Sequence, residues 1–135
     1  LDTNGSNPGI LKKLIKQKLI DYVAMDIKAS LSTKKYGEAT GGKANLNDIK
    51  ESIEIIRESG IEYEFRSTVL PKLHSQDDIV DIAKTLQGAA VYYLQQFRLE
   101  KTLDFSYQKT KQFNQTELKI IQEECNKYIL TKLRN

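Results

Sequence analysis

The chain has 135 residues, 39% hydrophobic and 29% charged, which is typical of a single globular domain and excludes a disordered or fibrous protein. Its net charge of +3 arises from 21 basic and 18 acidic residues that are interleaved, so no nucleic-acid partner is expected. The longest apolar runs are strand-sized, so we expect no membrane span. A single cysteine excludes an internal disulfide and fits a reducing, cytoplasmic compartment.

The first five residues, Leu1-Asp2-Thr3-Asn4-Gly5, have the pattern of a strand end that runs into a turn. The body of that strand is missing, and the sequence does not begin with methionine. We therefore expect the chain to be a piece of a longer protein.

Hydrophobic periodicity and helix-capping residues predict alternating helices and strands after this turn. Helices are expected at 8–18, 48–59, 76–86 and 117–133, and strands at 20–28, 61–70 and 89–97. Residues 29–45 are expected to form a long glycine-containing loop, and residues 99–114 an irregular segment. Strict alternation of this kind favours an α/β fold in which parallel strands are joined by right-handed crossovers.

Charged side chains occur where the predicted strands end, which is unusual for buried strands because unpaired buried charge is costly. In Tyr22-Val23-Ala24-Met25-Asp26-Ile27-Lys28 the aspartate and the lysine are two residues apart, so they share one side of the strand. Interior parallel strands are normally continuous apolar runs, so this pattern fits a barrel or half-barrel with a wet lumen at one rim. Ligands of parallel α/β folds bind at the carboxyl ends of the strands. The polar residues expected there are Asp2, Asp26, Lys28, Arg66, Gln96 and Arg98.

Each of these groups also has a plain structural explanation. Asp2, Thr3 and Asn4 could serve the turn alone, Asp26 and Lys28 could form structural ion pairs, and Arg66 could pair with Glu64 across the lumen. Three consecutive strands nevertheless present polar groups at one rim, which favours a site for a small zwitterionic or anionic ligand. In such a site an arginine clamps a carboxylate with two hydrogen bonds, and a lysine offers a point charge.

The remaining candidates for chemistry have weaker support. Oxygen atoms of Asp2, Thr3 and Asp26 could hold a hard cation. We find no nucleophile with an adjacent base, so no catalytic residue is assigned. His74 is expected to be a loop or cap residue, and Cys125 a core residue of the last helix. One histidine and one cysteine are too few ligands for a zinc or iron–sulfur site.

Four segments, in this order and spacing, resemble the second half of the radical S-adenosylmethionine activating enzymes. They are Asp2-Thr3-Asn4-Gly5, Tyr22-Val23-Ala24-Met25-Asp26-Ile27-Lys28, Phe65-Arg66-Ser67-Thr68-Val69 with Pro71, and Leu94-Gln95-Gln96-Phe97-Arg98. The last segment is most similar to the anaerobic ribonucleoside-triphosphate reductase activating proteins, and pyruvate formate-lyase activating enzyme is a close relative. The resemblance covers residues 1–104, which leaves residues 105–135 as an irregular segment with a C-terminal helix.

This resemblance implies a fold and a reaction. The fold would be the parallel-stranded second half of a partial (β/α)6, TIM-like barrel. The family cleaves S-adenosylmethionine reductively at a [4Fe–4S] cluster, and the resulting 5′-deoxyadenosyl radical abstracts a hydrogen atom from a glycine of a partner enzyme. Carried over by position, the cofactor contacts would be Lys28, Arg66, Gln96 and Arg98. The site of a possible monovalent cation would be Asp2, Thr3 and Asp26, with the Ala24 carbonyl.

The sequence departs from the family in lacking the cluster-binding Cys-x3-Cys-x2-Cys loop. We therefore expect this chain to supply cofactor and cation contacts, to be inactive alone, and to self-associate through open strand edges. Two other hypotheses remain: a non-catalytic small-ligand module with Arg66 and Lys28 as an anion clamp, and an α/β module that binds a protein partner. A Cys-x3-Cys-x2-Cys segment upstream of Leu1 would favour the enzyme.

Overall fold

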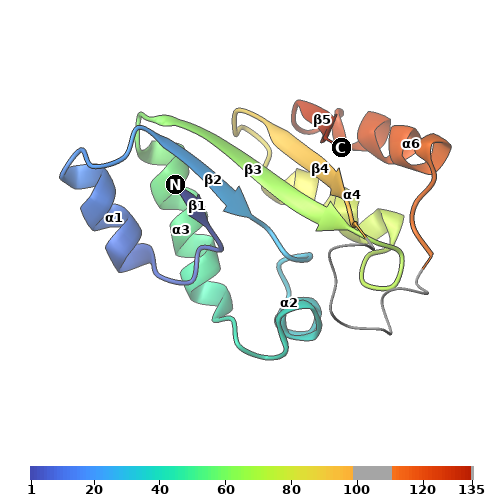
Figure 1. Cartoon of the computed structure of the whole chain (residues 1–135), viewed down its shortest axis with the longest axis horizontal. Helices are drawn as coiled ribbons and strands as arrows, with labels where there is room; N and C mark the ends of the chain where they lie inside the picture. Colours follow the sequence, from blue (N-terminus) through green and yellow to red (C-terminus); the bar gives the residue numbers. More distant parts are fainter. Residues whose placement is uncertain (99–110, 135) are drawn as a thin grey trace.

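The structure is a computed structural model, and it describes residues 1–98 and 111–134. Its centre is a sheet of five parallel strands that follow one another in chain order from β1 to β5 (Figure 1). The strands are β1 (Asp2–Thr3), β2 (Tyr22–Asp26), β3 (Glu62–Val69), β4 (Tyr92–Gln96) and β5 (Thr131–Arg134). The predicted α/β class with parallel strands is therefore confirmed.

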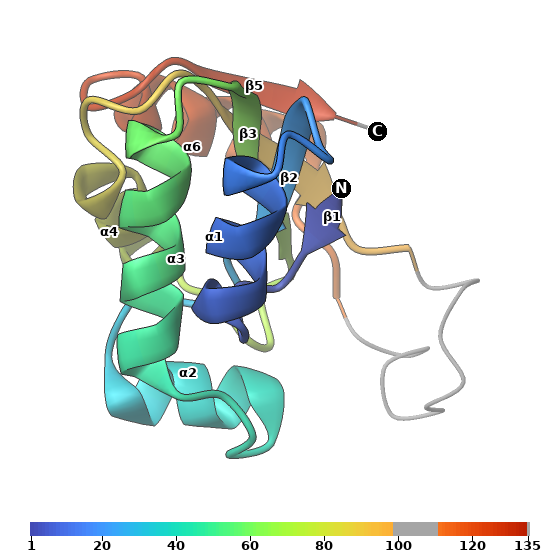
Figure 2. The same ribbon diagram turned by 90° about the vertical axis from the view of Figure 1, so that its left-hand side faces the viewer.

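Helices connect the strands. They are α1 (Pro8–Lys16), α2 (Thr33–Thr40), α3 (Leu46–Glu58), α4 (Gln76–Thr85) and α6 (Gln115–Cys125). Figure 2 shows α1, α3, α4 and α6 on one side of the sheet, while α2 lies at the end towards which the strands run. Among the described residues no helix covers the other side of the sheet, as expected for the inner surface of a half-barrel.

The helix ends follow from local sequence. The Asn7 side chain accepts a hydrogen bond from the Ile10 N–H, and Pro8 occupies the first turn of α1. Ser75 is the N-cap of α4 and forms a complete capping box, in which its hydroxyl accepts from the Asp78 N–H and the Asp78 carboxylate accepts from the Ser75 N–H. Gly60 follows α3 with φ 77°, a left-handed conformation that glycine adopts without strain.

One helix lies where a loop was predicted. Residues 33–40, inside the expected loop 29–45, form α2, whose N-cap is Ser32 and whose C-cap is Gly41 with φ 66°. The helix buries one large side chain, Tyr36, which is 2% exposed. A helix held by a single buried residue has no repeating apolar stripe, so periodicity could not detect it.

The last predicted helix is too long. α6 ends at Cys125, and residues 131–134 form the edge strand β5 instead of continuing the helix to 133. The apolar spacing changes there from the helical Leu118, Ile121 and Cys125 to the alternating Ile129, Thr131 and Leu133, a period of two. Of the irregular segment 99–114, residues 111–114 are described and form neither helix nor strand, whereas 99–110 lie outside the described residues.

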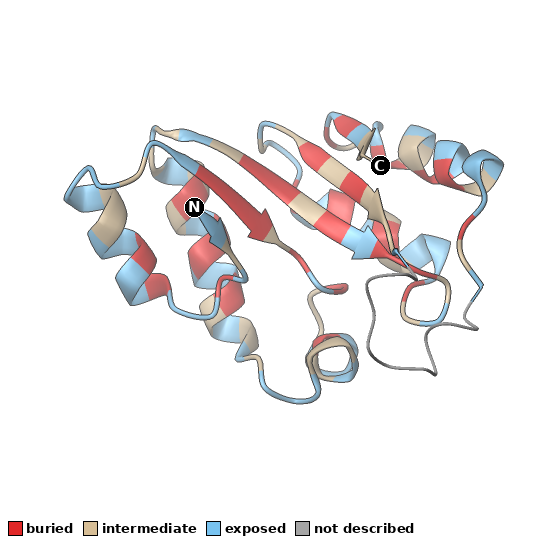
Figure 3. Ribbon diagram, in the orientation of Figure 1, coloured by how far each residue is buried: buried red, intermediate tan, exposed pale blue. Residues whose placement is uncertain are grey.

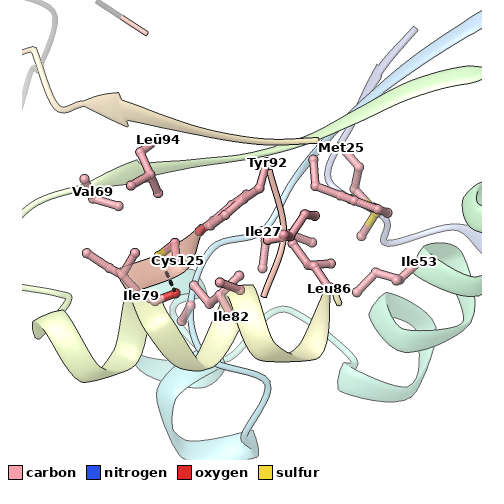
Figure 4. Close-up of a cluster of buried hydrophobic side chains, with 14 of the residues drawn as sticks. Met25, Ile27, Ile53, Val69, Ile79, Ile82, Leu86, Tyr92, Leu94 and Cys125 are labelled. Atoms are coloured by element: carbon pink, nitrogen blue, oxygen red, sulfur yellow. Dashed lines mark hydrogen bonds between the residues drawn. The ribbon is translucent and has the colours of Figure 1, made fainter. Parts of the chain in front are cut away.

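The hydrophobic core lies between the sheet and its helices, and in Figure 3 the middle of β2 is continuously buried while buried and partly buried residues alternate over the first part of β4. Tyr92 from β4 packs there with Ile79 and Ile82 of α4 and with Cys125 of α6 (Figure 4). Burial raises the pKa of the Cys125 thiol to about 12, so it remains protonated. The prediction that Cys125 is a core residue is therefore confirmed.

None of the described helices is both long enough and apolar enough to cross a membrane.

Candidate functional site

The register of the sheet decides which side chains meet on its inner surface. Met25 and Phe65 are register partners, and both are fully buried against the helices. Asp26 and Arg66 are the next partners in that register, so their side chains lie on the opposite surface, facing the lumen. Asp2 is the partner of Ala24, two residues before Asp26, and therefore shares this surface.

Asp2, Asp26, Lys28 and Arg66 form a line of alternating charges, which we call the charge cluster. The Nε atom of Arg66 is 2.6 Å from Oδ1 of Asp26, and its Nη2 atom is 3.2 Å from Oδ2 of Asp2. The second carboxylate oxygen of Asp26 is 3.5 Å from Nζ of Lys28. Arg66 of β3 thus connects Asp2 of β1 to Asp26 at the end of β2, and Asp26 lies between two cations.

Exposure separates a fixed part of the cluster from an open part. The side chain of Arg66 is 18% exposed and that of Asp26 27%, whereas the side chain of Lys28 is 43% exposed. The Asp26 carboxylate raises the pKa of Arg66, so the guanidinium is charged throughout the accessible pH range. Arg66 and Asp26 are therefore the less exposed ion pair of the cluster, and the ammonium of Lys28 is its more exposed cation.

A pocket of about 290 Å³ lies beside Lys28. Its polar lining comes from the turn after β1 and from the region of α2, and it includes Asn4, Ser6, Lys28, Thr40 and Lys43. Ala39, Ala44 and Ile49 are among the remaining lining residues. A mixed lining with two lysines suits a small organic ligand that carries a carboxylate.

Three predicted site residues do not join the cluster. Thr3 is the register partner of Met25, so it lies on the helix side, where its hydroxyl accepts the Gly5 N–H at 3.0 Å. Gln96 is the register partner of Val69 and also lies on the helix side. Arg98 is exposed and lies beyond the end of β4.

Gln96 has a different environment from the one expected. Its Nε2 atom donates to the Phe113 carbonyl oxygen at 2.6 Å, and its buried Oε1 atom has no hydrogen-bond partner among the described residues. Gln96 therefore ties β4 to the segment before α6, and it is not in position to contact a ligand held by Arg66. We do not retain it among the cofactor contacts.

The predicted cation site is incomplete in this arrangement. Asp2 and Asp26 each have a carboxylate oxygen within bonding distance of Arg66, and Thr3 lies on the other side of the sheet. The described residues include no group of three or more histidine, cysteine, aspartate or glutamate side chains that could hold a metal ion.

A second polar group lies on the lumen surface, nearer the start of β3, where Glu64 has partners that were not predicted from the sequence. Glu64, 6% exposed, accepts from the Tyr22 hydroxyl at 2.7 Å and from Nη1 of Arg134 at 2.7 Å. The Arg134 guanidinium also lies over the Tyr93 ring, 3.8 Å from its centroid. Glu64 is therefore paired with Arg134 and not with Arg66. The signal that could have found Arg134 is the alternating pattern of residues 131–134.

No protein-family model matches the chain. Over 133 residues the chain is 35% identical to a protein of Methanocaldococcus jannaschii that carries the provisional name glycyl-radical enzyme activating enzyme. That alignment takes in 96% of this chain and 55% of the relative, so the chain spans about half the length of the curated relative that it matches.

The fold is similar to that of a solved domain of pyruvate-formate lyase-activating enzyme from Bacteroides vulgatus, with a TM-score of 0.69. The superposition covers 100% of this chain and 98% of that domain at 10% sequence identity, so it shows the fold alone. The sequence match and the fold match agree with the resemblance carried by the four motifs. The chain is therefore similar in sequence to a glycyl-radical enzyme activating enzyme over about half of that protein's length, and similar in fold to a domain of pyruvate-formate lyase-activating enzyme.

Proposed function

We propose that this chain binds S-adenosylmethionine as part of an enzyme that activates a glycyl-radical enzyme by hydrogen abstraction. The observation that carries the proposal is the charge cluster, which gathers residues of three adjacent parallel strands near the carboxyl end of β2. The carboxyl ends of parallel strands are where ligands bind in α/β folds. Bound S-adenosylmethionine supplies, in this family, the radical that removes a hydrogen atom from the partner's glycine.

Within this proposal the residues have distinct tasks. Lys28, the exposed cation beside the pocket, pairs with the carboxylate of the methionyl group. Arg66 uses its Nε and Nη2 atoms to hold Asp26 and Asp2 and directs its remaining N–H groups towards the ligand. Asp26 orients both cations. Arg98, which stands where a family relative has a histidine near the adenosyl group, is retained as a proposed contact to that group.

The residues of this chain do not fit an iron–sulfur cluster. Such a cluster needs several thiolates, and the only cysteine is Cys125. That thiol is fully buried in the core and remains protonated. The cluster that the family requires would be held by residues outside this chain, so we expect the chain alone to be catalytically inactive and to form no stable cluster when supplied with iron and sulfide.

The partner enzyme is proposed to be of the anaerobic ribonucleotide reductase type. Support comes from the segment Leu94-Gln95-Gln96-Phe97-Arg98, which resembles the corresponding segment of the reductase activating proteins. Affinity capture of the whole activating protein together with its glycyl-radical enzyme tests this assignment. Recovery of a formate-lyase type enzyme instead of a reductase would overturn it while leaving the cofactor site intact.

Ligand titration followed by nuclear magnetic resonance tests the cofactor site. We expect S-adenosylmethionine added to the isotopically labelled chain to shift the amide signals of residues 26–28 and the Nε–H signal of Arg66. Adenosine alone should leave the Lys28 signals unshifted, because it lacks the carboxylate. Shifts confined to the exposed lysines of α1, or no saturable shifts at all, would contradict the proposal.

A further inference from the structure

The chain leaves the sheet after Asp26 and loses the regular pattern of backbone hydrogen bonds there. Beyond that point one backbone hydrogen bond and several side-chain hydrogen bonds hold the segment. The Ile27 N–H still donates to the Arg66 carbonyl oxygen at 2.8 Å, and the Ile27 carbonyl oxygen accepts from the buried Ser67 hydroxyl at 2.6 Å. The segment that leads to Lys28 is therefore held to β3 beyond the end of the strand.

Lys28 itself is held at both of its backbone polar groups. Its N–H donates to the Tyr36 hydroxyl oxygen at 3.0 Å, and its carbonyl oxygen accepts from Nε2 of His74 at 2.8 Å. Tyr36 comes from α2 and His74 from the loop between β3 and α4, and their residues are 2% and 3% exposed. Two buried side chains from different parts of the chain thus converge on one residue.

The partners of His74 define its tautomer. The Nδ1 atom accepts from the Leu70 N–H at 3.3 Å, so the proton of the neutral ring is on Nε2 and points to Lys28. The His74 N–H returns a bond to the Leu70 carbonyl oxygen at 2.9 Å. The imidazole is therefore fixed in position before it contacts Lys28, although sequence reasoning expected only a loop or cap residue.

This arrangement matters because a lysine side chain is long and flexible. Fixing the backbone of Lys28 limits the region that its ammonium can reach, and less conformational freedom is then lost when a ligand binds. Tyr36 also lines the pocket beside Lys28, so the same side chain shapes the pocket and holds the cation next to it.

We propose that Tyr36 and His74 are positioning residues that hold Lys28 in place for the carboxylate of the ligand. The inference rests on the proposed function of Lys28 as a contact to S-adenosylmethionine. Neither side chain needs to touch the ligand's reacting atoms. Their effect on binding passes through the backbone of Lys28.

Three substitutions separate this role from a general contribution to folding. Tyr36→Phe removes only the hydroxyl that accepts the Lys28 N–H. His74→Asn retains an acceptor for the Leu70 N–H but cannot reach the Lys28 carbonyl, whereas His74→Gln retains a donor that can. Tyr63→Phe is the matched control, because the Tyr63 hydroxyl also accepts a backbone N–H, that of Ala90 at 3.2 Å, away from the site.

The readouts are the hydrogen-exchange rate of the Lys28 amide and the dissociation constant for S-adenosylmethionine, measured on the 135-residue chain. We expect Tyr36→Phe and His74→Asn to weaken binding about five-fold, the net effect of one hydrogen bond. We expect Tyr36→Phe to speed exchange of the Lys28 amide about ten-fold. His74→Gln and Tyr63→Phe should bind within about two-fold of the unmodified chain.

If these expectations are not met, the affinity of Lys28→Ala for S-adenosylmethionine distinguishes failure of the positioning role from failure of the proposed function. If Lys28→Ala weakens binding while Tyr36→Phe and His74→Asn do not, the positioning role is wrong and the proposed function stands. If Lys28→Ala leaves binding unchanged, both are wrong. Equal weakening by His74→Asn, His74→Gln and Tyr63→Phe would show a general loss of structure and would also overturn the positioning role. Should His74→Asn fail to fold, Tyr36→Phe decides alone.

Discussion

Tyr92, Ser67 and Ile27 form a buried chain of hydrogen bonds behind the site. The Tyr92 hydroxyl donates to Oγ of Ser67 at 2.7 Å, and Ser67 donates to the Ile27 carbonyl oxygen at 2.6 Å. Tyr92 and Ser67 are 0% exposed, so water cannot replace a lost partner. Burial also raises the pKa of Tyr92 far above its usual value, which keeps the hydroxyl a donor. The effects of substituting Tyr92 and Ser67 on the free energy of unfolding should therefore be strongly non-additive.

The expected loss of unfolding free energy depends on which buried groups each substitution leaves without a hydrogen-bond partner. Tyr92→Phe removes one hydrogen bond and should cost about 1 kcal/mol of unfolding free energy. Ser67→Ala leaves both the Tyr92 hydroxyl and the Ile27 carbonyl unpaired and should cost about 3 kcal/mol. The double substitution leaves only the Ile27 carbonyl unpaired, so it should cost about 2 kcal/mol, less than Ser67→Ala alone.

Urea unfolding followed by circular dichroism measures these differences, provided that the slope of free energy against urea is the same for all four proteins. The decisive comparison is Tyr92→Phe made in the Ser67→Ala background, where it should stabilise the protein by about 1 kcal/mol. A double substitution that costs about 4 kcal/mol, as additive behaviour requires, would refute the hydrogen-bonded chain.

Three further predictions concern the turn at Gly5, the titration of Tyr36 and the edge of the sheet. Gly5→Ala should cost about 1–3 kcal/mol of unfolding free energy, because φ is 75° and the new Cβ would lie 2.2 Å from Cε of Met25. The control Gly37→Ala, in α2 with nothing within 4 Å, should be neutral or stabilise by up to about 1 kcal/mol, and equal losses would contradict the strain at Gly5. Burial raises the pKa of Tyr36 to about 12, so its contribution to stability is complete below about pH 10, the pKa expected in the unfolded chain, and is lost as pH rises from about 10 to 12. Tyr36→Phe should therefore show a shallower fall in unfolding free energy across that interval, by about 1.4 kcal/mol per pH unit, and an unchanged slope would contradict it. The exposed edge of β1, which pairs only with β2 among the described strands, should make the chain self-associate with rising concentration, whereas a monomer at all concentrations in light scattering would show that the edge is protected.

The alternation of helices and strands was predictable because most elements have a strong periodic signal. α1, α3 and α4 each carry an apolar stripe and a recognisable cap, and β3 alternates cleanly. α2 and β5 were not predicted, because α2 buries one large residue and β5 follows a helix without a glycine or proline between them. Elements this short are defined by tertiary contacts, such as the pairing of β5 with β4.

The site was predictable to the extent that strand ends define it. Asp26, Lys28 and Arg66 meet because β2 ends at Asp26, which is the register partner of Arg66 on the neighbouring parallel strand. A position near the end of a strand does not show which surface of the sheet the side chain occupies. Gln96 was for this reason expected at the ligand site, whereas it lies on the helix side of the sheet. Gln96 shares its side of β4 with Tyr92 and Leu94, and those buried residues mark that side as the one facing the helices.

The central claim is that Lys28 in the charge cluster binds the carboxylate of S-adenosylmethionine. Calorimetric titration of the 135-residue chain with S-adenosylmethionine tests it directly, with Lys28→Ala and with Lys13→Ala on the exposed side of α1 as the matched control. We predict one bound ligand per chain, binding at least about ten-fold weaker in Lys28→Ala, and no change in Lys13→Ala, since a hydrogen bond to a charged group is worth about 1.5–3 kcal/mol. Absence of binding, or equal weakening by the two lysine substitutions, would contradict the account.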